Sequence, residues 1–400
     1  MSEIESLRLH SLLYDGITEL NTFAHNLYTV RELWERHGGC AILGFVLLDA
    51  PQLEGRMGWQ EFDRTLLTIA ENLKSCAQAH PGSILSINRV RGDEFYLFLP
   101  VDSDLGSVRD EILAVLGSRG VDLSFLSCGA GLFRSQEGVR WERLLYRAVE
   151  EVRDGAVSQG RKKEEALTTY LEGMAAHPNF TLHYQPIVRL RDRTPIGYEC
   201  LFRLPMGAPF VGNELFFAFA EKTPYITAIE EQIWDMAHAE LGPGPEILFF
   251  NVTPHTLLQS GRFLLNGDRS VVLEITERVK IPDWGLFRRK VDELKAAGRR
   301  IAIDDVGAGY SSLQAVLEIQ PNFIKIDYSL IHGMDNHPIK RGLIASLAEA
   351  ADHMGSQVIA ECIESAGELA ALLELGVELG QGNALQPPLP RDQLHLLPAS

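Results

Sequence analysis

Seven polar residues in the second half of the chain stand in or directly after short apolar, β-rich runs. They are Glu199, Asn251, Glu274, Asp304, Asp305, Lys325 and Glu361. Burying several carboxylates together without compensation is very unfavourable, because like charges repel in a low-dielectric site and lose their hydration. Divalent cations are the natural compensation. Oxygen ligands with one amide and no Cys or His favour a hard ion such as Mg²⁺ or Mn²⁺ over zinc.

Two such ions would form a clamp for phosphodiester hydrolysis. At a separation of about 3.5–4 Å, one ion activates water and both stabilise the charge that develops on the phosphate. The adjacent pair Asp304 and Asp305 suits a bridging role, and Lys325 could orient the attacking water or neutralise the transition state. A structural alternative stays open, because a single acidic residue at a strand end is more often a helix cap than a metal ligand.

The runs that carry these residues predict a barrel. They recur, with helical patterns between them, at 181–188, 196–202, 246–252, 271–275, 301–304, 323–326 and 357–360, and an eighth is conceivable near 375–379. Strands that alternate with helices in this number are typical of a TIM-like (β/α)8 barrel. The carboxyl ends of its parallel strands converge on one face, so we expect the polar residues to meet there.

The first 160 residues predict a different kind of fold. We expect helices at 30–37, 59–75, 108–116 and 141–157, strands at 41–48 and 123–133, and a hairpin at 83–100. The hairpin turns at Arg91-Gly92-Asp93, because Gly beside Asp between β-rich runs is a strong turn signal. The order β-α-β-β-α-β indicates a ferredoxin-like α+β domain.

A polar, highly charged segment separates the two patterns. Residues 158–165 read SQGRKKEE, with no apolar periodicity. We interpret them as a linker or the exposed start of a connecting helix, which gives domains at 1–157 and 166–400. A chain of 400 residues exceeds what one hydrophobic core usually supports, so two domains are the default. The predicted class is therefore α/β, with an α+β domain before a barrel.

The charge of the chain limits its partners. Lys and Arg total 37 against 54 Asp and Glu, a net charge of −17. This argues against binding extended nucleic acid or a membrane surface through basic patches. The five cysteines are scattered without a CxxC spacing. We find no signal peptide, and no apolar run approaches the roughly 20 residues that span a bilayer. We expect a cytoplasmic protein without a membrane segment.

The second half resembles the EAL-domain family of cyclic di-GMP phosphodiesterases from about residue 166 to the C-terminus. The matching stretches are LHYQPIV (182–188), GYECLFR (197–203), FNVTP (250–254), LEITER (273–278), IAIDDVGAGYSSL (301–313), IKID (324–327), VIAECIE (358–364) and GQGNALQPP (380–388). Eight motifs in order across a whole domain are a specific signal. The resemblance implies hydrolysis of cyclic di-GMP to linear pGpG with two Mg²⁺ or Mn²⁺ ions.

The resemblance also implies roles for individual residues. The metal ligands would be Glu199, Asn251, Glu274 and Asp304 for one ion and Asp304, Asp305 and Glu361 for the other, and Lys325 would contact the nucleophilic water. Among these, Glu199, Asp304, Lys325 and Glu361 are the expected catalytic residues. Arg203 would bind a substrate phosphate, Gln185 and Leu201 would line the dinucleotide pocket, and Gln381 would lie in the outer part of the site. Glu277 would brace the loop 306–312, which in the family couples the site to a dimer interface, so a homodimer is expected.

Several neighbours of these residues depart from the family. Cys200 replaces Ala in the signature tripeptide, Val306 replaces Phe, Cys362 replaces Gly and Asn383 replaces an aromatic residue. The change at Cys362 matters most, because Gly often serves where the backbone adopts positive φ. These changes could lower turnover without removing the metals.

The first domain resembles the GGDEF family of diguanylate cyclases in a degenerate form. RGDEF (91–95) is similar to the family's motif, and DGITELN (15–21) is similar to its entry segment. Arg91 stands where the family brings backbone close to GTP, and Asp49 lacks an acidic partner two residues on. We expect no cyclase activity, and Asp93 and Glu94 are also explained simply as a polar hairpin turn.

Two further hypotheses compete with the enzyme. The barrel could be a weak or inactive cyclic di-GMP receptor that signals through a protein partner, or a scaffold that works only through protein contacts. The retained ligand set favours the phosphodiesterase, with the first domain as a regulatory module. Cys362, Val306 and the degenerate first domain keep the receptor open.

Overall fold

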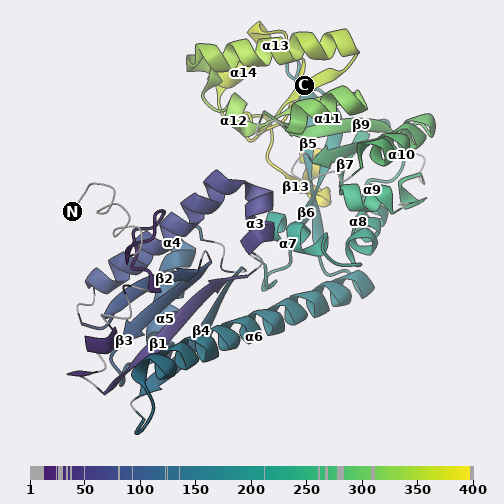
Figure 1. The fold of residues 1–400 in the computed structure, drawn as a ribbon. Helices are drawn as coiled ribbons and strands as arrows, with labels where there is room; N and C mark the ends of the chain where they lie inside the picture. The colour runs from purple at the N-terminus through teal and green to yellow at the C-terminus, as the bar shows by residue number, and fades with distance from the viewer. Residues whose placement is uncertain are drawn as a thin grey trace. The chain divides into compact units, whose positions relative to one another are not determined.

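The computed structural model divides the chain into two units, Met1–Leu167 and Thr168–Ser400 (Figure 1). It describes residues 13–396 except for 24, 26–29, 33, 34, 37, 49, 80, 81, 92, 122, 124, 135, 211, 260, 261, 266–268, 277–282 and 308–310. Each unit has its own sheet. No helix within this described part is long and apolar enough to cross a membrane.

The first unit is built on a four-stranded antiparallel sheet in the order β2-β3-β1-β4. Its elements follow the chain as β1 Gly39–Leu47, α3 Ala50–Met57, α4 Trp59–Ala79, β2 Ser86–Arg91, β3 Glu94–Leu99, α5 Leu105–Ser118 and β4 Leu126–Arg134. The order β-α-β-β-α-β that we expected is present, with α3 as an addition. No helix is among the expected elements between residues 48 and 59.

The central strand β1 is buried along its whole length, which explains its unbroken apolar sequence. Successive side chains point to opposite faces of a sheet. Leu43 and Phe45 therefore join the cluster formed with α4 and α5, whereas Ile42 joins the cluster that contains Val152 of α6. The sheet is covered on both faces.

The segment 158–165 lies inside one long helix, α6 Trp141–Ala176, and is not a separate linker (Figure 1). The alternative of a connecting helix describes it better. Its Lys, Glu, Arg and Gln residues are good helix formers even without apolar periodicity. Gly160 permits a close contact, because a Cβ there would lie 2.4 Å from a methyl carbon of Leu48, and Lys163 Nζ donates to the Leu123 carbonyl at 2.6 Å.

The second unit is a closed barrel of eight strands within the described residues. They are β5 Thr181–Arg189, β6 Pro195–Arg203, β7 Ile247–Val252, β8 Val271–Thr276, β9 Arg300–Val306, β10 Phe323–Ile326, β11 Gln357–Ala360 and β12 Leu379–Gly380. Pairing of β12 with β5 closes the ring, and the short β13 Leu389–Pro390 adds to the other side of β5. The prediction of a TIM-like barrel is confirmed, and the eighth strand begins at the last residue of the range 375–379 expected for it and ends one residue beyond that range.

One strand departs from the expected all-parallel arrangement. β5 runs antiparallel to both β6 and β12. Residues 190–194 alone connect β5 to β6, and a parallel crossover needs about a dozen residues or more. The helices of this unit are α7 Asn213–Ala220, α8 Ile226–Leu241, α9 Pro254–Leu258, α10 Trp284–Ala296, α11 Ser311–Ile319, α12 Tyr328–Ile331, α13 Pro338–Met354 and α14 Ala366–Glu374.

Candidate functional site

The barrel core sets the positions of the polar residues. One apolar layer takes a residue from each of seven strands: Ile187, Phe249, Val272, Ala302, Phe323, Ile359 and Leu379. Residues two apart on a strand point to the same face. Six residues of this layer, all except Ile187, lie on parallel strands. Two residues further toward the C-terminus of each strand stand Asn251, Glu274, Asp304, Lys325, Glu361 and Gln381. Because β5 is antiparallel, the corresponding residue lies two positions before Ile187 and is Gln185.

On β6, Glu199 lies two residues after Gly197, which takes the corresponding place in the apolar layer. A Cβ at Gly197 would lie 2.3 Å from the Ile247 carbonyl oxygen, so only Gly fits this place in the layer. Glu199 is itself buried. The strand alternation therefore brings the polar residues that the sequence singled out to one end of the barrel, directly above its apolar filling.

Lys325 is the centre of this polar layer. It is fully buried, and its ammonium contacts four carboxylates. Its Nζ lies 2.9 Å from Glu361 Oε1, 3.1 Å from Glu274 Oε1 and Asp304 Oδ1, and 3.3 Å from Glu199 Oε2. One cation thus faces four acids in a low-dielectric site, which leaves an excess of negative charge.

The pKa values reflect this imbalance. The four carboxylates overcome the effect of burial and raise the pKa of Lys325 well above its ordinary value. Burial, together with the charges of neighbouring acids, raises the pKa values of Glu274 and Glu361 well above theirs. Glu199 differs, since Lys325 and hydrogen bonds from the two site amides outweigh burial and lower its pKa. The acids of the layer thus differ in pKa, with Glu274 and Glu361 shifted up and Glu199 shifted down.

Two amides connect the carboxylates. Gln381 Nε2 donates to Glu199 Oε2 at 2.6 Å and to Glu361 Oε1 at 3.0 Å. Asn251 Nδ2 donates to Glu199 Oε1 at 3.0 Å. Because the nitrogen of Asn251 is used in this way, its oxygen remains the atom with which it could ligate a cation.

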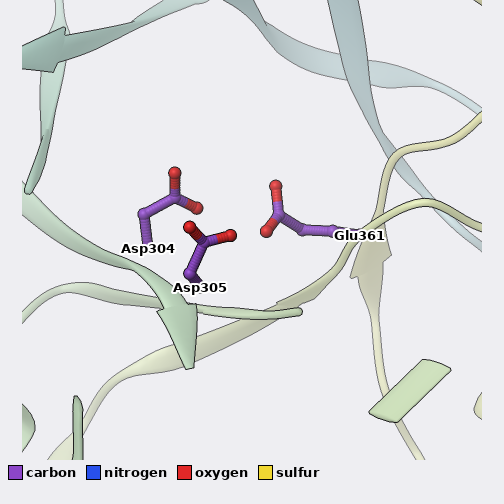
Figure 2. A group of neighbouring side chains, drawn as sticks. All are labelled: Asp304, Asp305 and Glu361. Atoms are coloured by element: carbon purple, nitrogen blue, oxygen red, sulfur yellow. The ribbon is translucent and has the colours of Figure 1, made fainter. Parts of the chain in front are cut away.

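The carboxylates of Asp304, Asp305 and Glu361 gather at one point and face one another (Figure 2). A ligand oxygen from each lies within 4.8 Å of the others. Asp305 adopts φ +57°, a left-handed conformation that Asp tolerates better than most residues and that lets consecutive aspartates both reach the site. The strand end is shaped to place two carboxylates side by side.

The donor set fits divalent cations. It consists of carboxylate and amide oxygens, the ligands that Mg²⁺ and Mn²⁺ prefer. Within the described part of the chain, the buried oxygens Glu274 Oε1, Asp304 Oδ1 and Gln381 Oε1 accept no hydrogen bond. The first two each lie 3.1 Å from Lys325 Nζ. Added positive charge would satisfy these atoms and relieve the repulsion.

The expected substrate residues line the β5–β6 edge of the same end. Leu201 and Arg203 follow Glu199 in two-residue steps, and Gln185 pairs with Glu199 across the strands. Gln185 Nε2 donates to the Gln386 carbonyl at 3.1 Å, while burial lowers the pKa of Arg203. Glu277 and residues 308–310 of the expected coupling loop lie outside the described residues.

Two departures from the family pattern have visible structural consequences. Cys362 adopts φ +50°, so the position does require the left-handed conformation that suits glycine. Val306 is buried in the barrel wall at the end of β9. Sequence analysis does not single out Glu230 of α8, a buried acid whose Oε1 accepts a hydrogen bond from the N–H of Thr253, two residues after Asn251. The helical period was an available signal, because Glu230 falls on the apolar face formed by Ile226, Ile229, Ile233 and Trp234, whereas its exposed neighbour Glu231 does not.

A closed barrel with a carboxylate-rich polar layer at one end is an arrangement that could hold divalent cations. The EAL domain family model matches residues 169–388, and the chain belongs to this family. It is 27% identical over 245 residues to Cyclic di-GMP phosphodiesterase PdeA of Borreliella burgdorferi, which is 57% of this chain and 36% of that protein.

Two further comparisons involve the protein MucR. The Bifunctional diguanylate cyclase/cyclic di-GMP phosphodiesterase MucR of Pseudomonas aeruginosa is 24% identical over 368 residues, 83% of this chain and 53% of that protein. The solved PaMucR phosphodiesterase in its c-di-GMP complex is 26% identical with a TM-score of 0.51, covering 57% of this chain and 99% of that chain. The chain thus spans about half or less of the length of these curated relatives.

Proposed function

We propose that the barrel is a phosphodiesterase that hydrolyses cyclic di-GMP to linear pGpG with two divalent cations, Mg²⁺ or Mn²⁺. The observation that carries the proposal is the convergence of four buried carboxylates on the single ammonium of Lys325. A binding pocket for an uncharged ligand has no need of this charge excess. Relatives named as cyclic di-GMP phosphodiesterases support the choice of substrate.

The ligands divide into two overlapping groups. Glu199, Asn251, Glu274 and Asp304 would hold one ion, and Asp304, Asp305 and Glu361 would hold the other. Bound ions would supply an activated water and stabilise the charge that develops on the phosphate. The cluster of the second group supports its assignment.

Lys325 acts as a fixed positive charge and hydrogen-bond donor in this proposal. Its pKa is raised by the surrounding acids, so the amine does not serve as a base. A permanently charged ammonium can orient the attacking water through its lone pair and neutralise the transition state. Gln381 keeps Glu199 and Glu361 in place through its two donated hydrogen bonds.

Substrate binding falls to the β5–β6 edge. Arg203 would bind a phosphate of the dinucleotide, with Gln185 and Leu201 beside it. The guanidinium is half-buried and donates to the Phe202 carbonyl at 3.1 Å, which limits its rotation. A restrained Arg suits bidentate recognition of phosphate.

The first unit serves in this proposal as a degenerate GGDEF-like, ferredoxin-like regulatory domain without cyclase activity. The antiparallel order β2-β3-β1-β4 supports the fold assignment. The side chain of Arg91, all of Gly92 and Asp49 lie outside the described residues. A homodimer formed through the EAL domain and a cytoplasmic location complete the proposal, the latter supported by five free thiols.

The test is to incubate the full chain with cyclic di-GMP and Mn²⁺ and to follow pGpG by chromatography, with calorimetry of binding in parallel. We expect pGpG to accumulate with time. Binding without product would reject the enzyme and favour the receptor alternative, for which the strained Cys362 next to Glu361 would be the cause.

A further inference from the structure

We propose that Glu230 is a positioning residue for Asn251, acting through the backbone that follows β7. This inference rests on the proposed function, because it concerns the one amide ligand of the first ion. Glu230 lies on α8 with 2% of its surface exposed. Its Oε1 accepts a hydrogen bond from the Thr253 N–H at 2.9 Å. Thr253 is two residues after Asn251.

The helix that carries Glu230 is fixed to the strand that carries Asn251. Trp234 of α8 packs edge-on against Phe250 of β7, with ring centroids 5.2 Å apart. Glu230 is four residues before Trp234, so both side chains project from the same face of the helix. The contact between Trp234 and Phe250 holds α8 against the outer face of β7. Glu230 therefore lies beside the C-terminal end of β7.

The backbone N–H of Thr253 needs a hydrogen-bond acceptor from another part of the chain. Thr253 is the N-cap of α9, and its hydroxyl accepts from Thr256 N. Its own N–H is buried with the residue and is satisfied by Glu230. Without that carboxylate, the N–H would be left unpaired at a substantial energetic cost, or the chain would move to find another partner.

A small movement of this segment changes the direction of the Asn251 side chain. Asn251 Nδ2 donates to Glu199 Oε1 at 3.0 Å, and this bond turns its oxygen toward the site. Amide ligands depend on such orientation, and partners that orient ligands commonly affect metal affinity by roughly 10–100-fold when removed. Glu230 would therefore act on the metal site without touching it.

The test compares four variants of the full chain. Glu230→Ala removes the acceptor, Glu230→Asp retracts it by one methylene group, and Glu230→Gln keeps the acceptor oxygen without the charge. Glu231→Ala is the matched control, because Glu231 is exposed on the same helix turn. Two readouts are used: Mn²⁺ affinity from the free-ion signal in electron paramagnetic resonance, and the NMR cross-peak of the Asn251 side-chain amide, assigned by its loss in Asn251→Asp.

We expect Glu230→Ala and Glu230→Asp to weaken Mn²⁺ binding by roughly tenfold or more and to shift the Asn251 cross-peak. Glu230→Gln should rescue both properties, and Glu231→Ala should change neither. The proposal is overturned if Glu230→Asp matches Glu231→Ala in both readouts and differs only in melting temperature, because Glu230 would then be a structural cap. Absence of Mn²⁺ binding by the unmodified chain would reject the proposed metal chemistry, while the cross-peak would still decide whether Glu230 positions Asn251.

Discussion

Two buried acidic sites, one in each unit, compensate the charge of their carboxylates in different ways. Glu94 at the hairpin of the first unit accepts from Arg153 Nε at 2.8 Å and from the Tyr96 hydroxyl at 3.1 Å. In the barrel, Glu199, Glu274, Asp304 and Glu361 share Lys325. The hairpin site pairs its acid with a cation of its own, whereas the barrel site leaves charge uncompensated.

This difference in charge compensation is why we interpret Glu94 at the hairpin as structural and the barrel carboxylates as candidate metal ligands. An acid with its own guanidinium and hydroxyl partners ties two elements together, here β3 and α6. Acids that share one ammonium repel each other, and a bound cation would relieve that repulsion. The predictions below test this contrast.

The largest expected effect is on turnover. Asp304 belongs to both proposed ligand groups, so Asp304→Ala should reduce hydrolysis of cyclic di-GMP by roughly 10³-fold or more. Glu199→Ala should have a similar effect. Both variants should keep the circular dichroism spectrum of the fold. Asp352→Ala, an exposed change on α13, is the control for the chromatographic assay, and unchanged turnover in Asp304→Ala would reject the metal assignment.

The next effect is on the stability of the barrel without metal. Lys325→Met removes the one cation shared by four acids and should lower the free energy of unfolding by about 3–5 kcal/mol in metal-free buffer. Added Mn²⁺ should recover part of this loss, because it supplies charge to the same oxygens. Lys290→Met, which breaks only a surface pair with Glu293, should change stability little. Equal melting temperatures for the two variants would contradict the shared-cation account.

A pH-dependent effect is expected at Glu230. Burial raises its pKa to about 7 from an ordinary 4.5, against hydrogen bonds from Thr256 and Thr253 and with a further contribution from Glu221. An acid with a raised folded-state pKa loses its contribution as pH rises from the unfolded to the folded value. Stability should therefore fall by roughly 3 kcal/mol between about pH 4.5 and somewhat above pH 7.

Denaturant unfolding of Glu230→Gln measures this pH-dependent contribution to stability. Gln does not titrate, so the variant lacks the loss of stability that Glu230 causes at high pH. The free energy of unfolding of the variant minus that of the unmodified chain should therefore be larger at pH 8.5 than at pH 5. The same stability difference at both pH values would show that Glu230 keeps an ordinary pKa.

A smaller effect is expected in the first unit. Arg153→Met removes the guanidinium that pairs with Glu94 and should lower the free energy of unfolding by about 1–3 kcal/mol. Turnover per folded molecule should stay the same, because the pair is structural. Arg147→Met, from an exposed pair on the same helix, serves as the control. A loss of turnover specific to Arg153→Met would assign the hairpin a regulatory role instead.

The smallest effect is at Cys362. A non-glycine residue at φ +50° costs roughly 1–2 kcal/mol, so Cys362→Gly should raise the free energy of unfolding by about 1 kcal/mol. Cys362→Ala keeps the Cβ and its strain and should give no comparable gain. If both variants were equally stable, the thiol and not the backbone conformation would set the stability at this position.

Much of the barrel and its polar layer could be predicted because the signal is local. β10 and β11 have the predicted bounds, since short apolar runs with one polar interruption mark buried strands. The same two-residue period places Lys325 above Phe323 and Glu361 above Ile359. Residue type and spacing were sufficient there.

The remaining features depend on contacts that a single segment does not reveal. The residue types of 158–165 allow a helix, but its packing through Gly160 against Leu48 is a tertiary contact. The pairing of β12 with β5, which closes the ring, joins strands that are far apart in the sequence. Glu230 matters because Trp234 fixes its helix against β7, and this relation arises only from the tertiary structure.

The central claim is that the charge excess of the barrel binds cations, and the stoichiometry of Mn²⁺ binding tests it most directly. Titration of the full chain, followed by the electron paramagnetic resonance of free Mn²⁺, should give two bound ions per chain. Asp304→Asn should lose tight binding of both, because Asp304 belongs to both ligand groups. No tight Mn²⁺ binding by the unmodified chain, or two ions still bound by Asp304→Asn, would contradict the account.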